Sequence, residues 1–320
     1  MKNNITFDGI INLFTEKTNF TIIAHRRPDG DAVGSAAGLC LALRHLGKTA
    51  HWTSSDPVPP SLEFVPGVEH FTCTPNPNAF VVTVDTATPS MFDKLPSELH
   101  RIDLKIDHHA SGEDYATYNY TDTTAAACSE IIFRLAQQSN ALTDDVCRAI
   151  YVGLIADTGC FRYANTTANS FAIATEIACR GIAVAPIAEA CFGTRTPAAT
   201  AALAHALNTA VYMGDAAICA FTAADKARLG MTDNDTSEIS PFLRETQGVN
   251  FSAVLTQASD DLTEFRLSTR SREKYDASAF CRLFGGGGHI RAAGATITAN
   301  SPDAAWEQLT AAVKTFVGER

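Results

Sequence analysis

Short apolar runs that end in aspartate or histidine recur in the first third of this chain, and they constrain its fold more than any other feature. The runs cover residues 21–24, 79–84 and 101–106, and they are followed by His25, Asp85 and Asp107. Such runs, bounded by turn residues, are typical of buried strands. Because ligands of an α/β protein collect at the carboxyl edge of its sheet, the pattern predicts a polar site at that edge.

Segments with helical apolar spacing alternate with these strands. A further strand is expected at 48–55, and an amphipathic helix is expected near the N-terminus. Helices are expected from Ala32 onward and at 124–138, 144–155 and 169–181. Strands that alternate with helices predict an α/β fold with a doubly wound, mostly parallel sheet.

The composition shifts near residues 193–197, where we place a domain boundary. Beyond it we expect an Ala-rich helix at 198–212, strands at 216–221, 249–257 and 262–268, and helices at 238–244, 277–284 and 303–317. The sequence therefore predicts a first domain at 1–190, a linker helix at 191–212, and a smaller α+β domain at 213–320.

Charge and composition exclude several classes of protein. The formal net charge of -10 argues against a protein that grips long nucleic acid through its backbone. No apolar run approaches the roughly 20 residues needed to cross a bilayer, so no membrane association is expected. The nine cysteines form no CxxC pair, which favours reduced thiols and a cytoplasmic location over a disulfide framework.

The loop after the first run places His25, Asp29 and Asp31 within seven residues. Pro28 prevents helix through this loop and Gly30 allows a sharp turn, so the three side chains could meet at one point. Half of a metal site is one interpretation. The other is that Asp31 caps the following helix and Asp29 is an ordinary turn residue.

Four segments together supply a set of carboxylates and imidazoles without cysteine. The set is His25, Asp29, Asp31, Asp85, Asp107, His108, His109 and Asp157. Such ligands suit Mn²⁺ or Mg²⁺ better than structural zinc. They exceed the needs of one ion, which favours two ions that share a carboxylate and clamp a phosphoryl displacement. Each acid could instead cap a helix or turn, but Asp-His-His after an apolar strand has no packing purpose.

The motifs of this chain resemble those of the DHH-family phosphoesterases, which are named for the Asp-His-His triplet. HRRPDGDAVGS, TVDTA, IDHHAS and GLIADTGCFRYANTT are similar to the four motifs of the family, in that order. FGGGGHIRAAGA at 284–295 is similar to the signature of the DHHA1 substrate domain. Within the family, the chain looks most like the NrnA-type bifunctional oligoribonucleases, which also dephosphorylate 3'-phosphoadenosine 5'-phosphate.

The resemblance implies a role for each polar residue. One Mn²⁺ would be held by His25, Asp29 and Asp85, and the second by Asp31, Asp85, His108 and Asp157, with Mg²⁺ as an alternative metal. Asp85 would bridge the two ions. Asp107, His108 and His109 form the catalytic set, in which Asp107 orients an imidazole and His109 lies on the phosphate side.

A glycine run in the C-terminal part indicates an anion site. Without side chains the backbone amides there can close on a phosphate, and we assign Gly286, Gly287, Gly288 and His289 to substrate binding. Arg270 and Arg272 suit bidentate phosphate contact and join this set. The run could instead be a flexible turn, and the two arginines could pair with surface acids such as Asp260 or Asp261.

The expected function is a two-metal phosphodiesterase that degrades very short RNA or DNA to nucleoside 5'-monophosphates and dephosphorylates 3'-phosphoadenosine 5'-phosphate. Long nucleic acid is not an expected partner, and a homodimer is permitted. A phosphodiesterase for cyclic or linear dinucleotides is the first alternative, and a nucleotide sensor without turnover is another. An inorganic pyrophosphatase would share the first domain, but the GGGGH sequence argues against it.

Overall fold

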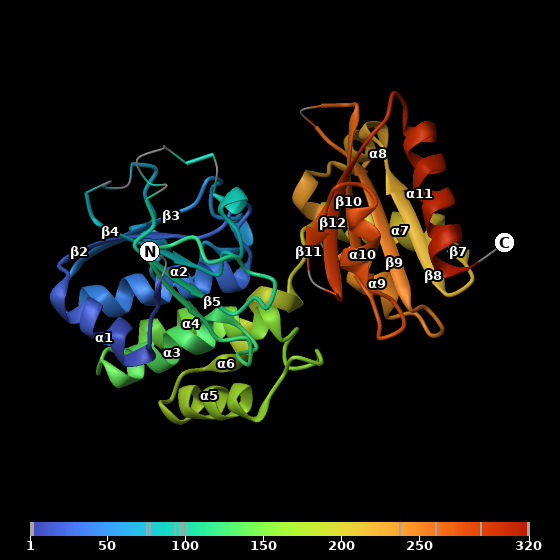
Figure 1. The fold of residues 1–320 in the computed structure, drawn as a ribbon. Coiled ribbons are helices and arrows are strands. Elements are labelled where there is room, and N and C mark those ends of the chain that lie inside the picture. The colour runs from blue at the N-terminus through green and yellow to red at the C-terminus, as the bar shows by residue number, and fades with distance from the viewer. Residues whose placement is uncertain are drawn as a thin grey trace. The chain divides into compact units, whose positions relative to one another are not determined.

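The computed structural model describes residues 3–74, 76, 78–92, 94–95, 99, 101–236, 238–259, 261–288 and 290–318. The chain divides into two units, Met1–Thr194 and Arg195–Arg320 (Figure 1). Among the described residues, no helix combines the length and the apolar character that crossing a membrane requires.

The first unit is built on a six-stranded parallel sheet with the order β1-β6-β5-β4-β2-β3. Its strands are β1 (Asn3–Asn4), β2 (Asn19–Ile23), β3 (Thr49–Thr53), β4 (Phe80–Val84), β5 (Leu104–Asp107) and β6 (Tyr118–Thr121). Every neighbouring pair is parallel. The predicted α/β class and parallel sheet are confirmed. Strand β6 was not predicted, because its sequence YNYT has no aliphatic run.

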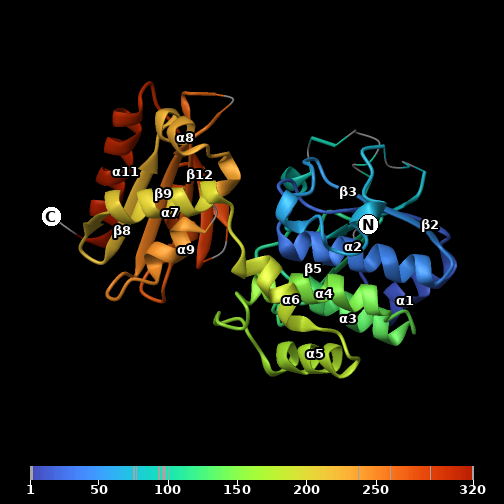
Figure 2. The same cartoon turned by 180° about the vertical axis from the view of Figure 1, so that it is seen from behind.

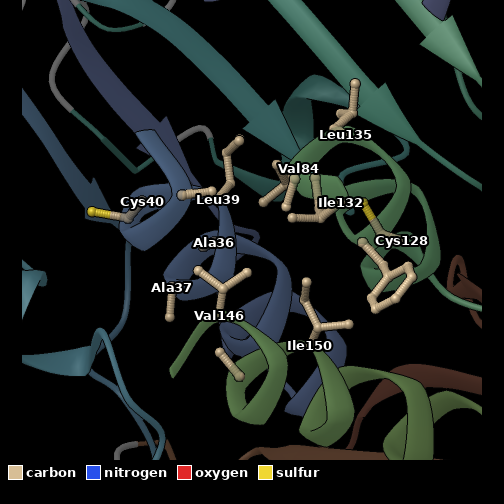
Figure 3. Packing of buried hydrophobic residues seen from close by; sticks show 14 of the residues in the cluster. Ala36, Ala37, Leu39, Cys40, Val84, Cys128, Ile132, Leu135, Val146 and Ile150 are labelled. Carbon is tan, nitrogen blue, oxygen red and sulfur yellow. The ribbon is translucent and has the colours of Figure 1, made fainter. Parts of the chain in front are cut away.

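The helices of the first unit lie on one side of this sheet, and the last two of them pack on other helices (Figure 1). They are α1 (Phe7–Glu16), α2 (Gly30–His45), α3 (Cys128–Gln138), α4 (Asp144–Asp157), α5 (Ala168–Cys179) and α6 (Val184–Ala188). Short 3-10 turns η1 (Pro60–Leu62), η2 (Val68–His70) and η3 (Pro89–Met91) and a π-helical turn η5 (Glu189–Gly193) complete the unit. The core on this face joins sheet residues such as Val84 to helix residues such as Ile132 and Ile150 (Figure 3).

The sheet winds in two directions from the neighbouring strands β2 and β4. The chain moves from β2 to the edge strand β3 through α2, and from β4 to β5 in the opposite direction. Right-handed crossovers in opposite directions lie on opposite faces. The second face is accordingly covered by the β4–β5 connection, in which Phe92 and Ile102 pack against Ile23 and Val81. The expected winding is present, and the described part of the β4–β5 connection contains the short turn η3.

Helices α2 and α4 approach closely because glycines line their contact. A Cβ on Gly30 would lie 2.6 Å from Ala156 Cβ, and a Cβ on Gly34 would lie 2.5 Å from Ala149 O. A Cβ on Gly153 would lie 2.6 Å from Asp31 Oδ1. The start of α2 is therefore held against the end of α4, which brings two predicted site residues, Asp31 and Asp157, into one region.

The second unit contains a mixed sheet with the order β11-β12-β10-β9-β8-β7 (Figure 2). Its strands are β7 (Val211–Met213), β8 (Ala216–Phe221), β9 (Phe251–Gln257), β10 (Glu264–Ser271), β11 (Gly287–Gly288) and β12 (Ala292–Thr298). Its helices are α7 (Pro197–Thr209), α8 (Ala223–Leu229), α9 (Ile239–Arg244), α10 (Ala277–Arg282) and α11 (Pro302–Val317), with a 3-10 turn η6 (Asp233–Thr236). Only β8 and β9 pair in parallel, so the predicted α+β class holds.

Two clusters of buried residues form the core of the second unit. One joins the sheet to α10 and α11, and the other joins it to α7 and α9. Helix α7 contributes Ala202 and Ala206, both fully buried, to the second cluster, so the predicted linker helix packs within this unit. The assignment of metal binding and catalysis to residues 1–190 and of substrate binding to 213–320, with 191–212 as a linker, stays a prediction.

Candidate functional site

The predicted polar residues lie where the first sheet changes its winding direction. Strands β2 and β4 are neighbours there, and the chain leaves them toward opposite faces. His25 follows β2, Asp85 follows β4 directly, and His108 follows β5. Asp157 ends α4 and so comes from a helix. In open α/β sheets a crevice forms at such a switch point, which explains why distant segments meet here.

His25, Asp29 and Asp85 form the first group of candidate ligands. His25 Nδ1 donates to Arg26 O at 2.9 Å, because a carbonyl oxygen can only accept. This bond leaves Nε2 for the site, where it lies 3.8 Å from Asp29 Oδ1 and 3.6 Å from Asp85 Oδ2. These separations are long for hydrogen bonds but suit two atoms that each lie about 2.1 Å from one shared ion.

Asp31, His108 and Asp157 form the second group. His108 Nδ1 donates to Ala125 O at 3.3 Å, and Nε2 lies 3.4 Å from Asp157 Oδ2. His108 Nε2 also lies 3.4 Å from Asp85 Oδ1. One oxygen of Asp85 thus faces His25 and the other faces His108, the arrangement expected of a carboxylate shared by two ions. Asp85 holds this position with a φ of 52°, a left-handed conformation that is uncommon for aspartate.

The two aspartates of the first loop also act as helix caps. Asp29 Oδ1 accepts from the amides of Asp31 and Ala32, so Asp29 caps α2. Asp31 lies inside α2, so the alternative interpretation that it caps this helix is wrong. It caps α3 instead, accepting from Cys128 N at 2.6 Å and Ser129 N at 3.0 Å. Capping fixes the orientation of both carboxylates, and each still lies within its group of candidate ligands.

Asp107 and His109 are joined by a short hydrogen bond. His109 Nδ1 lies 2.7 Å from Asp107 Oδ1 and 3.7 Å from Asp85 Oδ1. The other oxygen of Asp107 lies 3.1 Å from the Nζ atom of Lys105, a fully buried residue that our sequence analysis did not name. Alternation along β5 could have revealed it, since residues two apart in a strand share one face of the sheet.

The electrostatics of the cluster show a deficit of positive charge. Burial raises the pKa of Asp85 well above its usual value, and the nearby carboxylates of Asp31 and Asp29 raise it further. Burial and the same two carboxylates also raise the pKa of Asp157. Burial alone would lower the pKa of His25, but the nearby carboxylates of Asp29 and Asp85 outweigh this effect and raise it to about 9.

The residues fit a divalent cation. Asp85 Oδ1 is buried and accepts no hydrogen bond from any residue that the structure describes. A bound cation would reduce the repulsion between carboxylates that raise each other's pKa. Oxygen and imidazole donors without thiolate suit Mn²⁺ or Mg²⁺. The arrangement can therefore hold ions and polarise a phosphoryl group. The individual roles of these residues stay predictions.

In the second unit, the described part of the predicted anion site lies at one edge of the sheet. Gly287 and Gly288 form β11 and pair with Gly294 and Ala293 of β12. A Cβ on Gly286 would lie 2.2 Å from Gly294 O, so glycine is required there by the close approach of the backbone. Gly287 and Gly288 are exposed, so their backbone is open to a ligand. His289 lies outside the described residues.

The two arginines of the predicted site differ in their surroundings. Arg270 lies on β10 opposite Ala292, where its guanidinium donates to Thr269 O. Arg272 follows the strand and donates to Val249 O and Arg244 O, each at 3.1 Å. Asp261, one of the alternative partners, accepts from Thr263, and Asp260 lies outside the described residues.

Family models match both units of the chain. The model of the DHH family, N-terminal domain, matches residues 19–154, and the model of the DHHA1 domain matches residues 216–319. Of solved structures, an exopolyphosphatase-related protein from Bacteroides fragilis superposes with a TM-score of 0.88 at 22% identity, covering 98% of this chain and 97% of that one. The exonuclease RecJ bound to manganese superposes with a TM-score of 0.55 at 13% identity, covering 99% and 95%. These structures share the fold.

Relatives of similar sequence extend over almost the full length. The bifunctional oligoribonuclease and PAP phosphatase NrnA of Thermus thermophilus is 30% identical over 298 residues, which are 92% of this chain and 88% of the relative. The protein of the same name from Bacillus subtilis is 27% identical over 285 residues, which are 87% and 89%. With both domain models in the order DHH then DHHA1 and these motifs at the sheet edge, the chain belongs to the DHH family of phosphoesterases.

Proposed function

We propose that this hydrolase is a metal-dependent phosphodiesterase that degrades very short oligonucleotides to nucleoside 5'-monophosphates. The carrying observation is that Asp85 belongs to two groups of candidate ligands, one with His25 and Asp29 and one with His108 and His109. The relatives from Thermus thermophilus and Bacillus subtilis, named as oligoribonucleases and PAP phosphatases, support the same substrate class. We include dephosphorylation of 3'-phosphoadenosine 5'-phosphate in the proposal.

The residues of the first unit would hold two divalent ions. His25, Asp29 and Asp85 would hold one, and Asp31, Asp85, His108 and Asp157 the other. Mn²⁺ is the proposed metal, with Mg²⁺ as the alternative, and the manganese-bound RecJ structure supports this choice. When bound, such ions supply Lewis-acid activation of water and neutralise charge on the phosphoryl group.

His109 is proposed to contact the phosphate. Its Nδ1 lies 2.7 Å from Asp107 Oδ1, so a phosphate oxygen would contact this imidazole through Nε2. Burial opposes ionisation of Asp107, but the hydrogen bond from His109 and the charge of Lys105 lower its pKa to about 2. Asp107 therefore stays an anion at neutral pH and fixes the imidazole.

The second unit is proposed to bind the remaining phosphates of a short substrate. The exposed backbone of Gly287 and Gly288 and the side chains of Arg270 and Arg272 supply the donors, together with Gly286 and His289 of the same motif. The chain has a net charge of -10, which opposes the binding of long polyanions, so long nucleic acid is not a proposed substrate. A cytoplasmic location and a homodimer remain part of this proposal.

The test compares products on four substrates in parallel: diadenylate, cyclic di-AMP, 3'-phosphoadenosine 5'-phosphate and pyrophosphate. We expect Mn²⁺-dependent release of AMP from diadenylate and from 3'-phosphoadenosine 5'-phosphate, and loss of both activities with a chelator. Turnover confined to cyclic di-AMP would replace the proposal with the cyclic-dinucleotide alternative. Binding without turnover would favour a nucleotide sensor.

Metal analysis tests the two-ion site independently of substrate. Protein saturated with Mn²⁺ should contain two ions per chain, and anomalous scattering should place both beside Asp85. A single occupied position in active enzyme would contradict the shared carboxylate.

A further inference from the structure

Lys105 is a fully buried lysine in the middle of β5, a strand whose other side chains are also buried. Leu104 and Ile106 point to the helical core, so alternation places Lys105 on the opposite face together with Asp107. An ammonium group is costly to bury unless it is paired. An apolar residue would fill this position without that cost, so the contacts of Lys105 call for an explanation.

The ammonium of Lys105 is directed by contacts on several sides. Its Nζ atom lies 3.1 Å from Asp107 Oδ2 and donates to Glu113 O at 2.9 Å. The ring of Tyr115 has its centroid 5.6 Å from the same Nζ atom, and Tyr115 is itself fixed by a 2.8 Å bond with Thr83 Oγ1. A carbonyl, a carboxylate and an aromatic face thus leave the ammonium little freedom.

The backbone beside this pair leaves no room for rearrangement. A Cβ on Gly112 would lie 2.8 Å from both Lys105 Nζ and Asp107 Oδ2. The loop after β5 therefore closes directly over the pair, held in part by the bond from Gly112 N to His109 O. The same loop carries His109, so the position of this histidine depends on how the pair packs.

A continuous chain of contacts runs from the strand interior to the site. Lys105 meets one oxygen of Asp107, and the other oxygen accepts from His109 Nδ1 at 2.7 Å. Without an ammonium on Oδ2, the carboxylate of Asp107 could rotate and present either oxygen, or neither, to the imidazole. Lys105 can therefore affect the site through the Asp107 carboxylate and the His109 imidazole.

We propose that Lys105 is a positioning residue that fixes the carboxylate of Asp107 and thereby the tautomer and orientation of the His109 imidazole. This inference rests on the proposed function only in that His109 is expected to contact the phosphate. Lys105 itself touches neither substrate nor metal. Its effect on turnover passes entirely through His109.

The rival explanation is that Lys105 only neutralises a buried carboxylate and so stabilises the fold. Removing one partner of a buried pair commonly destabilises a protein, so loss of stability alone does not separate the explanations. The two explanations differ in whether the effects of substituting Lys105 and His109 on kcat depend on each other. If Lys105 acts through His109, substituting Lys105 lowers kcat only slightly in a variant that already lacks His109. If the two residues act independently, the fold-losses in kcat from the two substitutions multiply.

The kinetic test is a double-mutant cycle with Lys105→Met and His109→Gln, assayed with diadenylate at saturating Mn²⁺. Lys105→Met should lower kcat about 10- to 100-fold, which is the range for loss of a group that orients an active-site residue without contacting the substrate. In the His109→Gln background the same change should cost less than about threefold. Lys105→Gln, which keeps an N–H donor near Asp107, should lose less activity than Lys105→Met, and it replaces Lys105→Met in the cycle if the latter does not fold.

Lys226 provides the matched control. It is a buried lysine in the second unit, and its Nζ donates to Gln257 O at 2.9 Å. Lys226→Met should lower the melting temperature but leave kcat and KM of the folded enzyme within about twofold, because Lys226 bonds to Gln257 and Ser259 of its own unit and belongs to no group of candidate ligands among the described residues.

A second readout does not depend on turnover. Long-range ¹H–¹⁵N spectra of the full chain loaded with diamagnetic Mg²⁺ report the tautomer of each imidazole, and loss of one signal in His109→Gln assigns His109. We expect the proton on Nδ1 in the wild type and in Lys226→Met. In Lys105→Met the His109 signals should shift toward a mixture of tautomers.

The outcomes separate this inference from the proposed function. If the wild type has no metal-dependent hydrolysis but Lys105→Met alters the His109 tautomer, the proposed function fails and the positioning inference stands. If the wild type is active and the losses from Lys105→Met and His109→Gln multiply, or the His109 spectrum is unchanged in Lys105→Met, the positioning inference is overturned.

Discussion

The two units of this protein differ in the polar groups that they place at the edge of a sheet. In the first unit, carboxylates are withdrawn from solvent at the edge of a parallel sheet, and Asp31, Asp85 and Asp107 are all buried. In the second unit, the glycines of β11 are exposed at the edge of a mixed sheet, and nearby Arg270 is only half-buried. The first arrangement attracts cations and the second suits anions.

The difference shows what each kind of site requires of a fold. A cation site made of mutually repelling carboxylates needs a rigid, buried scaffold, because the acids must hold their positions before the ions arrive. That scaffold consists of helix caps, a tight helix pair and a left-handed Asp85. Backbone amides that meet a phosphate need only an open strand edge and glycine.

Substitution of the shared carboxylate should give the largest effect. Asp85→Ala removes an atom group from both sets of candidate ligands, so kcat should fall at least about 1,000-fold, equivalent to about 4 kcal/mol. Metal-free Asp85→Ala should melt at the same temperature as the wild type or higher, because a buried carboxylate with a raised pKa is removed. Kinetics and calorimetry measure the two effects.

The control for this substitution is Asp145→Ala. The Asp145 side chain is 60% exposed and pairs with Arg148 on the surface of α4. Its loss should leave kcat and the metal-dependent rise in melting temperature unchanged. Substantial turnover in Asp85→Ala would show that the site does not depend on a shared carboxylate, and the contrast between the units would lose its basis.

Substrate length tests how many phosphates of a substrate the second unit can bind. RNA of about two to five nucleotides should be cleaved at least about tenfold faster per end than a strand of about 25, with a shallow dependence on KCl. The reason is that a longer strand adds phosphates but meets a chain of net charge -10. Equal or faster cleavage of the long strand with a steep salt slope would indicate an extended basic groove.

The sequence predicted where His25, Asp85 and Asp107 lie because each of them directly follows a recognisable apolar run. The runs that became β2, β4 and β5 end in polar residues, and parallel strands bring such ends to one edge. Strand β12 (Ala292–Thr298) was missed because AAGATIT contains a single large apolar residue, Ile297, and its pairing with β10 is a tertiary effect. Helix α7 was predicted, but its packing partners depend on strands that lie beyond it.

The contacts that orient the site could not be predicted in the same way. Asp31 caps α3 across 97 residues of sequence, and no periodicity links those two segments. How closely neighbouring backbone segments approach determines three features of the site. These are the helix caps, the left-handed conformation of Asp85, and the bond between Asp107 and His109. Lys105 is an intermediate case, since alternation places it beside Asp107 but only the loop closure by Gly112 shows that the pair is confined.

Gly287→Ala tests whether a ligand approaches the backbone of β11. No atom lies within 4 Å of the Cβ that this change would add, so the fold tolerates it. We expect KM to rise roughly fivefold, about 1 kcal/mol, because a methyl group would stand between the amides and a phosphate. The melting temperature should change little.

Gly248→Ala is the matched control for folding effects. Gly248 also has open space around its Cβ but a φ of +85°, so alanine is strained there and stability should fall. Its KM should stay that of the wild type. If Gly287→Ala leaves KM unchanged as well, the exposed glycines serve the turn alone and the second unit must bind anions elsewhere.

The smallest expected effect concerns a surface charge pair that contrasts with the buried pair of Lys105 and Asp107. Asp215 accepts from Lys274 and Tyr275, each at 2.6 Å, at the end of the second sheet. Burial opposes ionisation, but these two bonds lower the pKa of Asp215 below its usual value. A carboxyl group with a lowered pKa in the folded state stabilises the protein above its unfolded pKa of about 3.9, and this contribution is lost as pH falls through the folded pKa.

Asp215→Asn should therefore destabilise the chain by about 1 kcal/mol at pH 7, because the Lys274 side chain is 59% exposed and solvent screens the pair. In calorimetry this corresponds to a melting temperature lower by about 2 to 5 °C. The difference from wild type should persist at pH 5 and shrink as pH falls below about 4. A difference that grew toward low pH would mean that Asp215 is protonated more readily in the folded state, and the assigned hydrogen bonds would be wrong.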